Sequence, residues 1–434
     1  MTTAYQHIHG LVMDAVKNGN IDPSADADIV RGQVAEIVRL YQRDAFASET
    51  RLALSKPTET VDRLVRAVCG LGELGDLIDD PQIEEIHVQG RRISYWTGDG
   101  DIGFLTHTPS EQQLMQYVRR ILQTMATGDR ELSAAKPVVT VGLSGGIGRL
   151  AVKIPPVVSE LTVAIRKTVL KNPSLELLVE RDMLTWPAAR LLQTLMTFPS
   201  RVIVAGAPAA GKTTLMNALL HAVPPKRVVR VNEEDRELTA PLTLGGYATA
   251  SDMPGQSLRD LIRADLRFRP ELLVVGEVRG SEAYEVLRPL NAGCGFLTSL
   301  HCNSATQAVE ALANAASLAF NGAVTDTTGL RRLFTPLIDV VVFCDADLHP
   351  DGSARLRQVT EIASVDGMTP EGDVIYQTLF DRAGGLGDEL RWSGMVPRHD
   401  LAARIERALP ARARLRDLLA GDRPSMPSEE MMRQ

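Results

Sequence analysis

The sequence of 434 residues is poor in cysteine and in aromatic residues, and it has no long hydrophobic run. Its four cysteines, Cys69, Cys294, Cys302 and Cys344, lie far apart and form no C-x-x-C pair. This spacing excludes a four-cysteine zinc module and is typical of a protein that works in a reducing cytoplasm.

The hydrophobic runs are too short for a membrane span, which needs about 20 consecutive apolar residues. The longest candidates, residues 272–275 and 337–344, have the length of buried strands. The first residues lack a basic segment followed by an apolar one, so no signal peptide is expected. We therefore expect a cytoplasmic protein with no membrane span of its own.

Aromatic residues make up only 4% of the chain, and the formal net charge is -7. A channel for single-stranded nucleic acid combines positive charge with aromatic side chains. The composition therefore makes nucleic acid an unexpected direct partner, although a local basic patch is compatible with it.

The length predicts two or three domains. Helical periodicity over residues 1–70 predicts an N-terminal helical extension, and short strands around one helix predict a small α+β (PAS-like) domain over 71–168. A linker is expected over 169–182. Buried strands that alternate with helices over 183–410 predict a parallel sheet with helices on both faces. Residues 411–434 are expected to be a flexible tail.

The strongest motif is a glycine-rich loop that follows an apolar strand and precedes a helix. Residues 206–214 fit G-x-x-x-x-G-K-[ST]. In such a loop the main chain wraps a phosphate chain at a helix N-terminus, Lys212 reaches the terminal phosphates and Thr213 offers a hydroxyl to Mg²⁺. The sequence thus predicts a site for ATP and Mg²⁺. The predicted binding residues of the loop are Gly206, Ala207, Pro208, Ala209, Ala210, Gly211, Lys212, Thr213 and Thr214.

Three further strands end in chemically active side chains. Residues 229–235 end in three acids, residues 272–277 end in Glu277, and residues 297–301 end in His301. Ligands of parallel α/β sheets bind at the carboxyl ends of the strands, so we expect these side chains near the loop. Mg²⁺ would remove the repulsion between carboxylates placed close together.

Four segments in this order, residues 206–214, 232–238, 275–283 and 298–304, resemble the Walker A loop, Asp box, Walker B strand and His box of the type II/type IV secretion ATPase family. The resemblance covers about residues 70–405. It implies a RecA-like P-loop ATPase domain, preceded by the small α+β domain and the helical extension.

The family resemblance also implies partners and a location. Such an enzyme hydrolyses ATP as a homo-oligomeric ring, a hexamer, at the inner face of the cell membrane. It docks on an integral-membrane platform protein and powers pilus assembly or substrate export. The helical extension and the lack of C-x-x-C pairs favour the tight-adherence (CpaF-like) pilus branch, or the related conjugation ATPases, over the general-secretion branch.

The resemblance implies a role for each matching residue. Glu277 would polarise the attacking water, Glu233 would support the metal and the water, and His301 would contact the γ-phosphate. The implied metal ligands are Thr213, Glu233 and Glu277. Arginines would close the site from the N-terminal domain or from a neighbouring subunit, and the matching positions are Arg149, Arg166, Arg267 and Arg279.

The sequence departs from the family pattern at three places. Glu234 stands where the Asp box usually has aspartate, residues 292–295 shorten a Gly-His-Asp-Gly segment, and Cys302 follows His301 where alanine is usual. Two alternatives therefore stay open beside the transport ATPase. One is a conjugative or DNA-processing motor, and the other is a nucleotide-gated scaffold that does not hydrolyse ATP.

Overall fold

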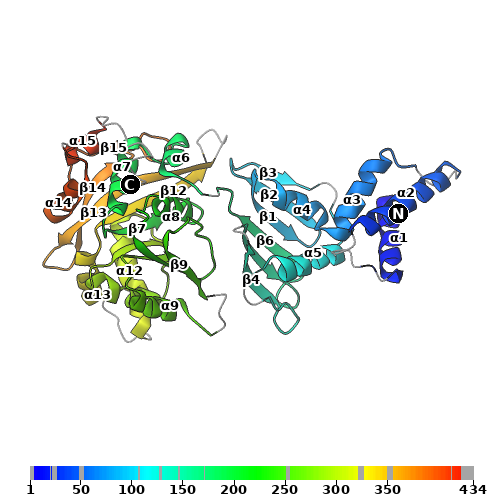
Figure 1. Cartoon of the computed structure of the whole chain (residues 1–434), viewed down its shortest axis with the longest axis horizontal. Coiled ribbons are helices and arrows are strands. Elements are labelled where there is room, and N and C mark those ends of the chain that lie inside the picture. The colour runs from blue at the N-terminus through cyan, green and yellow to red at the C-terminus, as the bar shows by residue number, and fades with distance from the viewer. Residues whose placement is uncertain are drawn as a thin grey trace. The chain divides into compact units, whose positions relative to one another are not determined.

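The computed structural model of the chain describes residues 4–19, 21, 27–47, 53–105, 108–126, 130–144, 147–170, 172–250, 255–320, 327–348, 355–411 and 413–421. Within them the chain divides into two compact units, residues 1–169 and 170–434 (Figure 1). No helix of the described residues is long and apolar enough to cross a membrane.

The N-terminal unit begins with three helices that share a hydrophobic core. These are α1 (Ala4–Asn18), α2 (Ala27–Phe46) and α3 (Pro57–Cys69). Each helix places apolar residues on one face, and the side chains of Ile8, Val34 and Leu64 are fully buried among them. The amphipathic pattern of these segments is what forms the helical bundle.

An antiparallel sheet covered by two helices completes this unit. Its elements are α4 (Gly72–Asp79), β1 (Ile83–Gln89), β2 (Arg92–Thr97), β3 (Ile102–Phe104), α5 (Glu111–Thr124), β4 (Val138–Leu143), β5 (Gly148–Lys153) and β6 (Thr162–Lys167). The strand order is β3-β2-β1-β6-β5-β4. One face of the sheet packs on α4 and α5, with Ile86, Leu114 and Leu150 in a common core.

The C-terminal unit is built on a nine-stranded sheet of order β15-β14-β13-β12-β7-β11-β10-β8-β9. Its strands are β7 (Arg201–Gly206), β8 (Val228–Glu233), β9 (Leu244–Thr249), β10 (Leu272–Glu277), β11 (Gly295–Leu300), β12 (Val340–Leu348), β13 (Arg355–Met368), β14 (Val374–Asp381) and β15 (Arg391–Trp392). Strands β7 to β12 are parallel, and β13 to β15 extend the sheet in antiparallel fashion.

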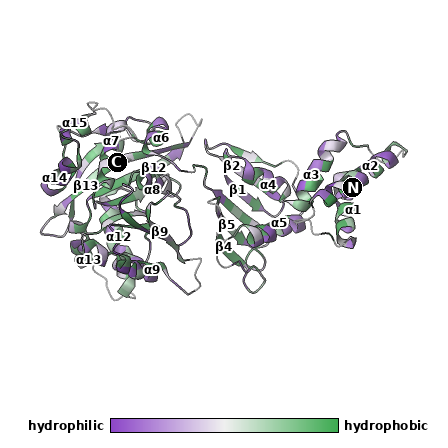
Figure 2. Ribbon diagram, viewed as in Figure 1, coloured by the Kyte–Doolittle hydropathy of each residue, from purple (hydrophilic) through white to green (hydrophobic). Residues whose placement is uncertain are grey.

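Helices cover both faces of this sheet (Figure 1). They are α6 (Leu175–Glu180), α7 (Trp186–Met196), α8 (Lys212–His221), α9 (Leu258–Asp265), η3 (Leu266–Phe268), α10 (Glu282–Glu285), α11 (Leu287–Asn291), η4 (Ala305–Gln307), α12 (Ala308–Ser317), η5 (Leu318–Phe320), α13 (Thr328–Phe334), η6 (Thr335–Leu337), α14 (His399–Ala408) and α15 (Leu415–Ala420). Consecutive residues of β7 belong to opposite cores: Val202 and Val204 to one, Ile203 and Ala205 to the other. The central strands, such as β7 and β10, are therefore largely hydrophobic (Figure 2), and the predicted α/β class is confirmed.

In two places a helix packs on the core within a segment expected to be a linker (169–182) or a flexible tail (411–434). Helix α6 lies inside the expected linker, with Leu175 and Leu178 buried in the core of the C-terminal unit. Helix α15 lies inside the expected tail, with Leu418 and Leu419 buried in the same core. Both segments bury apolar side chains, which a linker or tail would leave in water. The rest of the tail, residues 422–434, lies outside the described residues.

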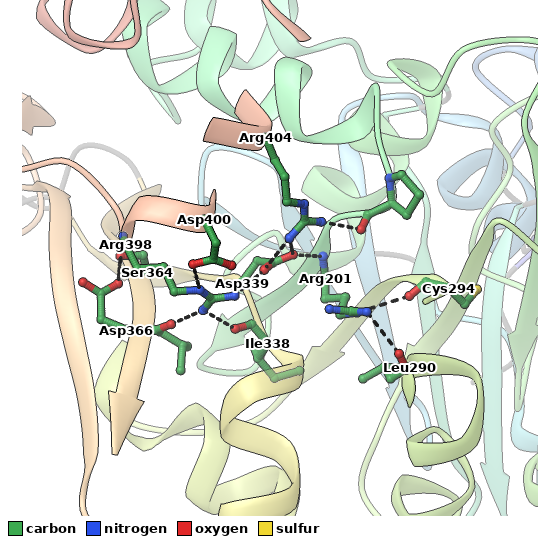
Figure 3. Close-up of polar contacts among 12 residues, drawn as sticks. Arg201, Leu290, Cys294, Ile338, Asp339, Ser364, Asp366, Arg398, Asp400 and Arg404 are labelled. Atoms are coloured by element: carbon green, nitrogen blue, oxygen red, sulfur yellow. Dashed lines mark hydrogen bonds and ion pairs between the residues drawn. The ribbon is translucent and has the colours of Figure 1, made fainter. Parts of the chain in front are cut away.

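A buried carboxylate fastens α14 to the sheet (Figure 3). Asp339 is fully buried just before β12, and its oxygens accept hydrogen bonds from Arg398 (2.7 Å) and Arg404 (2.9 Å). It also accepts the main-chain N–H of Arg201, at the start of β7 (3.0 Å). A buried charge is tolerated only when it is paired in this way.

Candidate functional site

Strand β7, the glycine-rich loop and helix α8 follow one another as the motif requires. Gly206 ends β7 with φ 144, and a Cβ there would lie 1.9 Å from the carbonyl oxygen of Cys344 on β12. Gly211 caps α8 with φ 86. At both positions the backbone has a conformation that side chains disfavour, and it leaves a loop of main-chain groups at the N-terminus of α8.

Lys212 is buried inside this loop, with 8% of its surface exposed. Its Nζ donates to the carbonyl oxygens of Gly206 (3.0 Å) and Ala207 (2.7 Å). A buried ammonium group needs such acceptors, and phosphate oxygens are acceptors that add opposite charge. Lys212 is therefore placed where it could bind a phosphate.

His301 joins the loop to the acidic strand end. It directly follows β11, the strand between β7 and β10. Its Nε2 lies 3.0 Å from Oε1 of Glu277, and its Nδ1 lies 3.3 Å from Nζ of Lys212 and 3.2 Å from the oxygen of Gly206. Nε2–H of the ring can donate to Glu277 while Nδ1 accepts from Lys212, so one imidazole bridges the carboxylate and the ammonium.

Glu233 ends β8 and shapes the turn that follows it. Its side chain is buried, and its carboxylate accepts the main-chain N–H groups of Glu237 and Leu238, both at 3.1 Å. Burial raises the pKa of Glu233 to about 8, although these N–H groups act in the opposite direction. A Cβ on Gly276 would lie 2.8 Å from Cγ of Glu233, so the glycine before Glu277 makes room for this side chain.

Two residues near the loop escaped the sequence reasoning. Oγ1 of Thr213 donates to Oε2 of Glu237 (3.3 Å). Asn217, buried on α8, accepts the N–H groups of Thr239 (2.9 Å) and Ala240 (3.2 Å). Glu237 lies in the same acidic run as Glu233, which is a signal that could have found it. Asn217 gives no such signal, because its partners follow the turn in sequence and meet it only in the fold.

The donors present suit Mg²⁺. The ion takes oxygen ligands and binds through one or two carboxylates together with substrate phosphates, so a complete protein cage is not needed. Thr213 and Glu237 place a hydroxyl and a carboxylate side by side at the start of α8. In the described part of the chain, no group of three or more His, Cys, Asp or Glu could hold a metal ion by itself.

The structure places the four predicted arginines differently. Arg279 lies 2.6 Å from Glu234 and 3.9 Å from Glu277, measured between side-chain nitrogen and oxygen. Arg267 is exposed on η3. Arg149 and Arg166 lie opposite each other on β5 and β6, in the N-terminal unit. Of the four, Arg279 is thus the one that the fold of the C-terminal unit brings to Glu277.

The fold and this loop define an α/β P-loop protein. In its sheet β11 lies between β7, which leads into the glycine-rich loop, and β10, which ends in Glu277. Residues 109–341 match the family described as Type II/IV secretion system protein. This match covers more than half of the chain, and the chain therefore belongs to that family.

Individual relatives agree with this membership. The chain is 30% identical over 271 residues to the type IV secretion system protein PtlH of Bordetella pertussis, covering 55% of this chain and 78% of PtlH. It is 26% identical over 317 residues to the conjugal transfer protein TrbB of Rhizobium radiobacter, covering 70% of this chain and 91% of TrbB.

The chain also matches a solved structure, that of the VirB11 ATPase from the Brucella suis type IV secretion system, with 24% sequence identity. The match covers 67% of this chain and 95% of VirB11, with a TM-score of 0.36.

Proposed function

We propose that this protein is a Mg²⁺-dependent ATPase that powers transport through a type II/IV-like secretion system. The observation that carries the proposal is the contact of His301 with both Glu277 and Lys212. Hydrolysis of a triphosphate needs positive charge on the phosphates, a metal and a group that orients water. Lys212, Thr213 and Glu277 are of the right chemical types for these three tasks and belong to neighbouring elements of one unit.

In this proposal each residue keeps the role that the family resemblance implied. The loop 206–214 holds the phosphates. Thr213, Glu277 and Glu233 would hold Mg²⁺, which supplies charge stabilisation and would displace the proton that burial favours on Glu233. Glu277 polarises the attacking water, and His301, which lies between Glu277 and Lys212, contacts the γ-phosphate. Arg149, Arg166, Arg267 and Arg279 complete the positive charge.

The working form would be a homo-oligomeric ring, a hexamer, docked from the cytoplasm on an integral-membrane platform protein. Pilus assembly by the tight-adherence branch was the prediction from sequence. Conjugation is the second candidate, because TrbB is named a conjugal transfer protein. A direct DNA motor is disfavoured by the net charge of -7 and the 4% of aromatic residues.

The test is phosphate release by the purified protein with ATP and Mg²⁺. Lys212→Ala removes the phosphate-binding ammonium, and we expect at least about a 10²-fold loss of kcat, the size of loss seen when one such electrostatic group is removed. Lys226→Ala changes an exposed lysine after α8 and serves as the matched control. Release that persists in Lys212→Ala contradicts the proposal, and ATP binding without turnover by the unaltered protein supports the scaffold instead. Stimulation by DNA would favour the DNA-processing motor.

A further inference from the structure

A buried amide and a buried carboxylate meet beside the candidate site. Nδ2 of Asn232 donates to Oδ2 of Asp265 at 2.8 Å, and the two side chains lie in the interior. Asn232 directly precedes Glu233 on β8. Asp265 ends α9 and directly precedes η3, the short turn that carries Arg267. The pair thus joins the strand that bears the acidic turn to the segment that bears an exposed arginine.

A second contact joins the same two elements. The guanidinium of Arg230 lies 4.1 Å from the centroid of the Phe268 ring, at the end of η3. Arg230 and Asn232 are two residues apart on β8, so their side chains leave the same face of the sheet. Strand β8 therefore holds η3 on both sides of Arg267, through Asp265 before it and Phe268 after it.

Helix α9 is also held by ion pairs to α10. Arg259 and Arg263, both on α9, donate to Oε1 of the buried Glu285 at 2.8 and 2.7 Å. Glu285 lies on α10, which follows β10, the strand that ends in Glu277, and the short loop that carries Arg279. Helix α9 is therefore fastened to β8, which carries Glu233, and to α10, which lies five residues after Glu277 in the sequence.

The Asn232–Asp265 pair is a poor choice for stability alone. Oδ1 of Asn232 is buried and has no hydrogen-bond partner among the described residues. Asp265 also places a carboxylate at the C-terminus of α9, where the helix dipole disfavours negative charge. Two apolar side chains would avoid both costs. Stability alone therefore does not explain why a polar, directional contact stands here.

We propose that Asn232 and Asp265 are a positioning pair, which fixes η3 and its Arg267 relative to the acidic turn at Glu233. This inference rests on the proposed ATPase function, because the pair would hold charged groups at the positions that phosphoryl transfer needs. Misplacement by about 1 Å can lower a rate about 10²-fold. An amide–carboxylate contact between β8 and α9 prevents such a shift in a way that apolar packing would not.

A swap of the two side chains tests this pair. Asn232→Asp puts two carboxylates together, and we expect kcat for ATP to fall about 10-fold or more, within the loss that misplacement causes, with KM changed less than about threefold. Hydrogen exchange of residues 266–269 should become faster. The double variant Asn232→Asp/Asp265→Asn restores the contact in reverse, and it should recover most of kcat and the slow exchange.

Gln358→Glu provides the control. Nε2 of the buried Gln358 donates to Oδ2 of Asp182 at 2.7 Å, another amide–carboxylate pair of the same unit. Loss of this hydrogen bond in Gln358→Glu should lower Tm without lowering kcat. Our inference is overturned if Asn232→Asp loses stability but keeps kcat, or if the folded double variant recovers neither kcat nor slow exchange.

If the unaltered protein releases no phosphate, the proposed function fails, and hydrogen exchange alone tests the pair. Unchanged exchange of residues 266–269 in Asn232→Asp then overturns the positioning pair.

Discussion

Nε2 of His301 and Oε1 of Glu277 are 3.0 Å apart, so the side chains that close β11 and β10 are in direct contact. The two strands are neighbours in the sheet, and β7 with its glycine-rich loop lies on the other side of β11. Because His301 also contacts Lys212, a change in the position of its ring affects both Glu277 and Lys212.

Replacing Glu277 with glutamine should separate nucleotide binding from turnover. Glutamine has the same shape and can still bind His301, but it cannot take a proton or polarise water as a carboxylate does. We expect kcat to fall about 10²–10⁴-fold, the usual contribution of a general base, while ATP binding stays within about threefold. Phosphate release and a fluorescent ATP analogue measure the two. Glu371→Gln, at an exposed turn, should leave both unchanged, and equal losses of binding and kcat would contradict this role.

Gly206→Ala should unfold the start of the loop. The new Cβ would lie 1.9 Å from a main-chain oxygen of Cys344, and φ 144 is unfavourable for any side chain. Overpacking costs about 1–3 kcal/mol and the backbone strain adds to it. Gly329→Ala is the matched control, because a Cβ there meets nothing within 4 Å and the residue lies in α13. Urea unfolding should show a loss for the first variant and none for the second. Equal stability of the two would refute the close packing of β7 on β12.

The buried Glu233 should make stability depend on pH. Burial raises its pKa from 4.5 to about 8, so the folded state holds the proton more tightly than the unfolded state. The protonated side chain contributes its full stabilisation below the unfolded-state pKa of 4.5, and this is lost as the pH rises through the folded-state pKa of about 8. The free energy of unfolding falls by at most about 1.4 kcal/mol per pH unit over this range.

Glu233→Gln keeps an acceptor for the N–H groups of Glu237 and Leu238 but cannot ionise. Without nucleotide, the free energy of unfolding of the unaltered protein should fall relative to this variant between about pH 5 and about pH 8. Urea titrations at several pH values measure the difference. Parallel curves would contradict the raised pKa.

Loss of the carboxylate of Asp339 should strongly destabilise the C-terminal unit. Asp339→Ala leaves the largely buried side chains of Arg398 and Arg404 without their shared partner (Figure 3). Breaking a buried pair from one side costs about 3–5 kcal/mol. Glu389→Gln breaks the exposed pair with Arg391 and should cost less than about 1 kcal/mol. Thermal unfolding compares the two, and a similar small shift for both would show that α14 is held by other contacts.

The sequence alone determined the local parts of this protein. The loop 206–214 and its flanking strand and helix follow from glycine placement and hydrophobic period, which act within a few residues. The alternation of buried strands and helices fixed the α/β class for the same reason. The four ordered segments led to the family, which the match over residues 109–341 shows.

Only the tertiary structure decided which distant residues meet. Local periodicity does not specify strand order, and that order puts β11 between β7 and β10 and so brings His301 to Glu277 and Lys212. The Asn232–Asp265 contact and the burial of Glu233 likewise depend on elements packed from far along the chain. Apolar residues of α6 and α15 were visible in the sequence, but whether they faced water or a core depended on the surface that the sheet offered them.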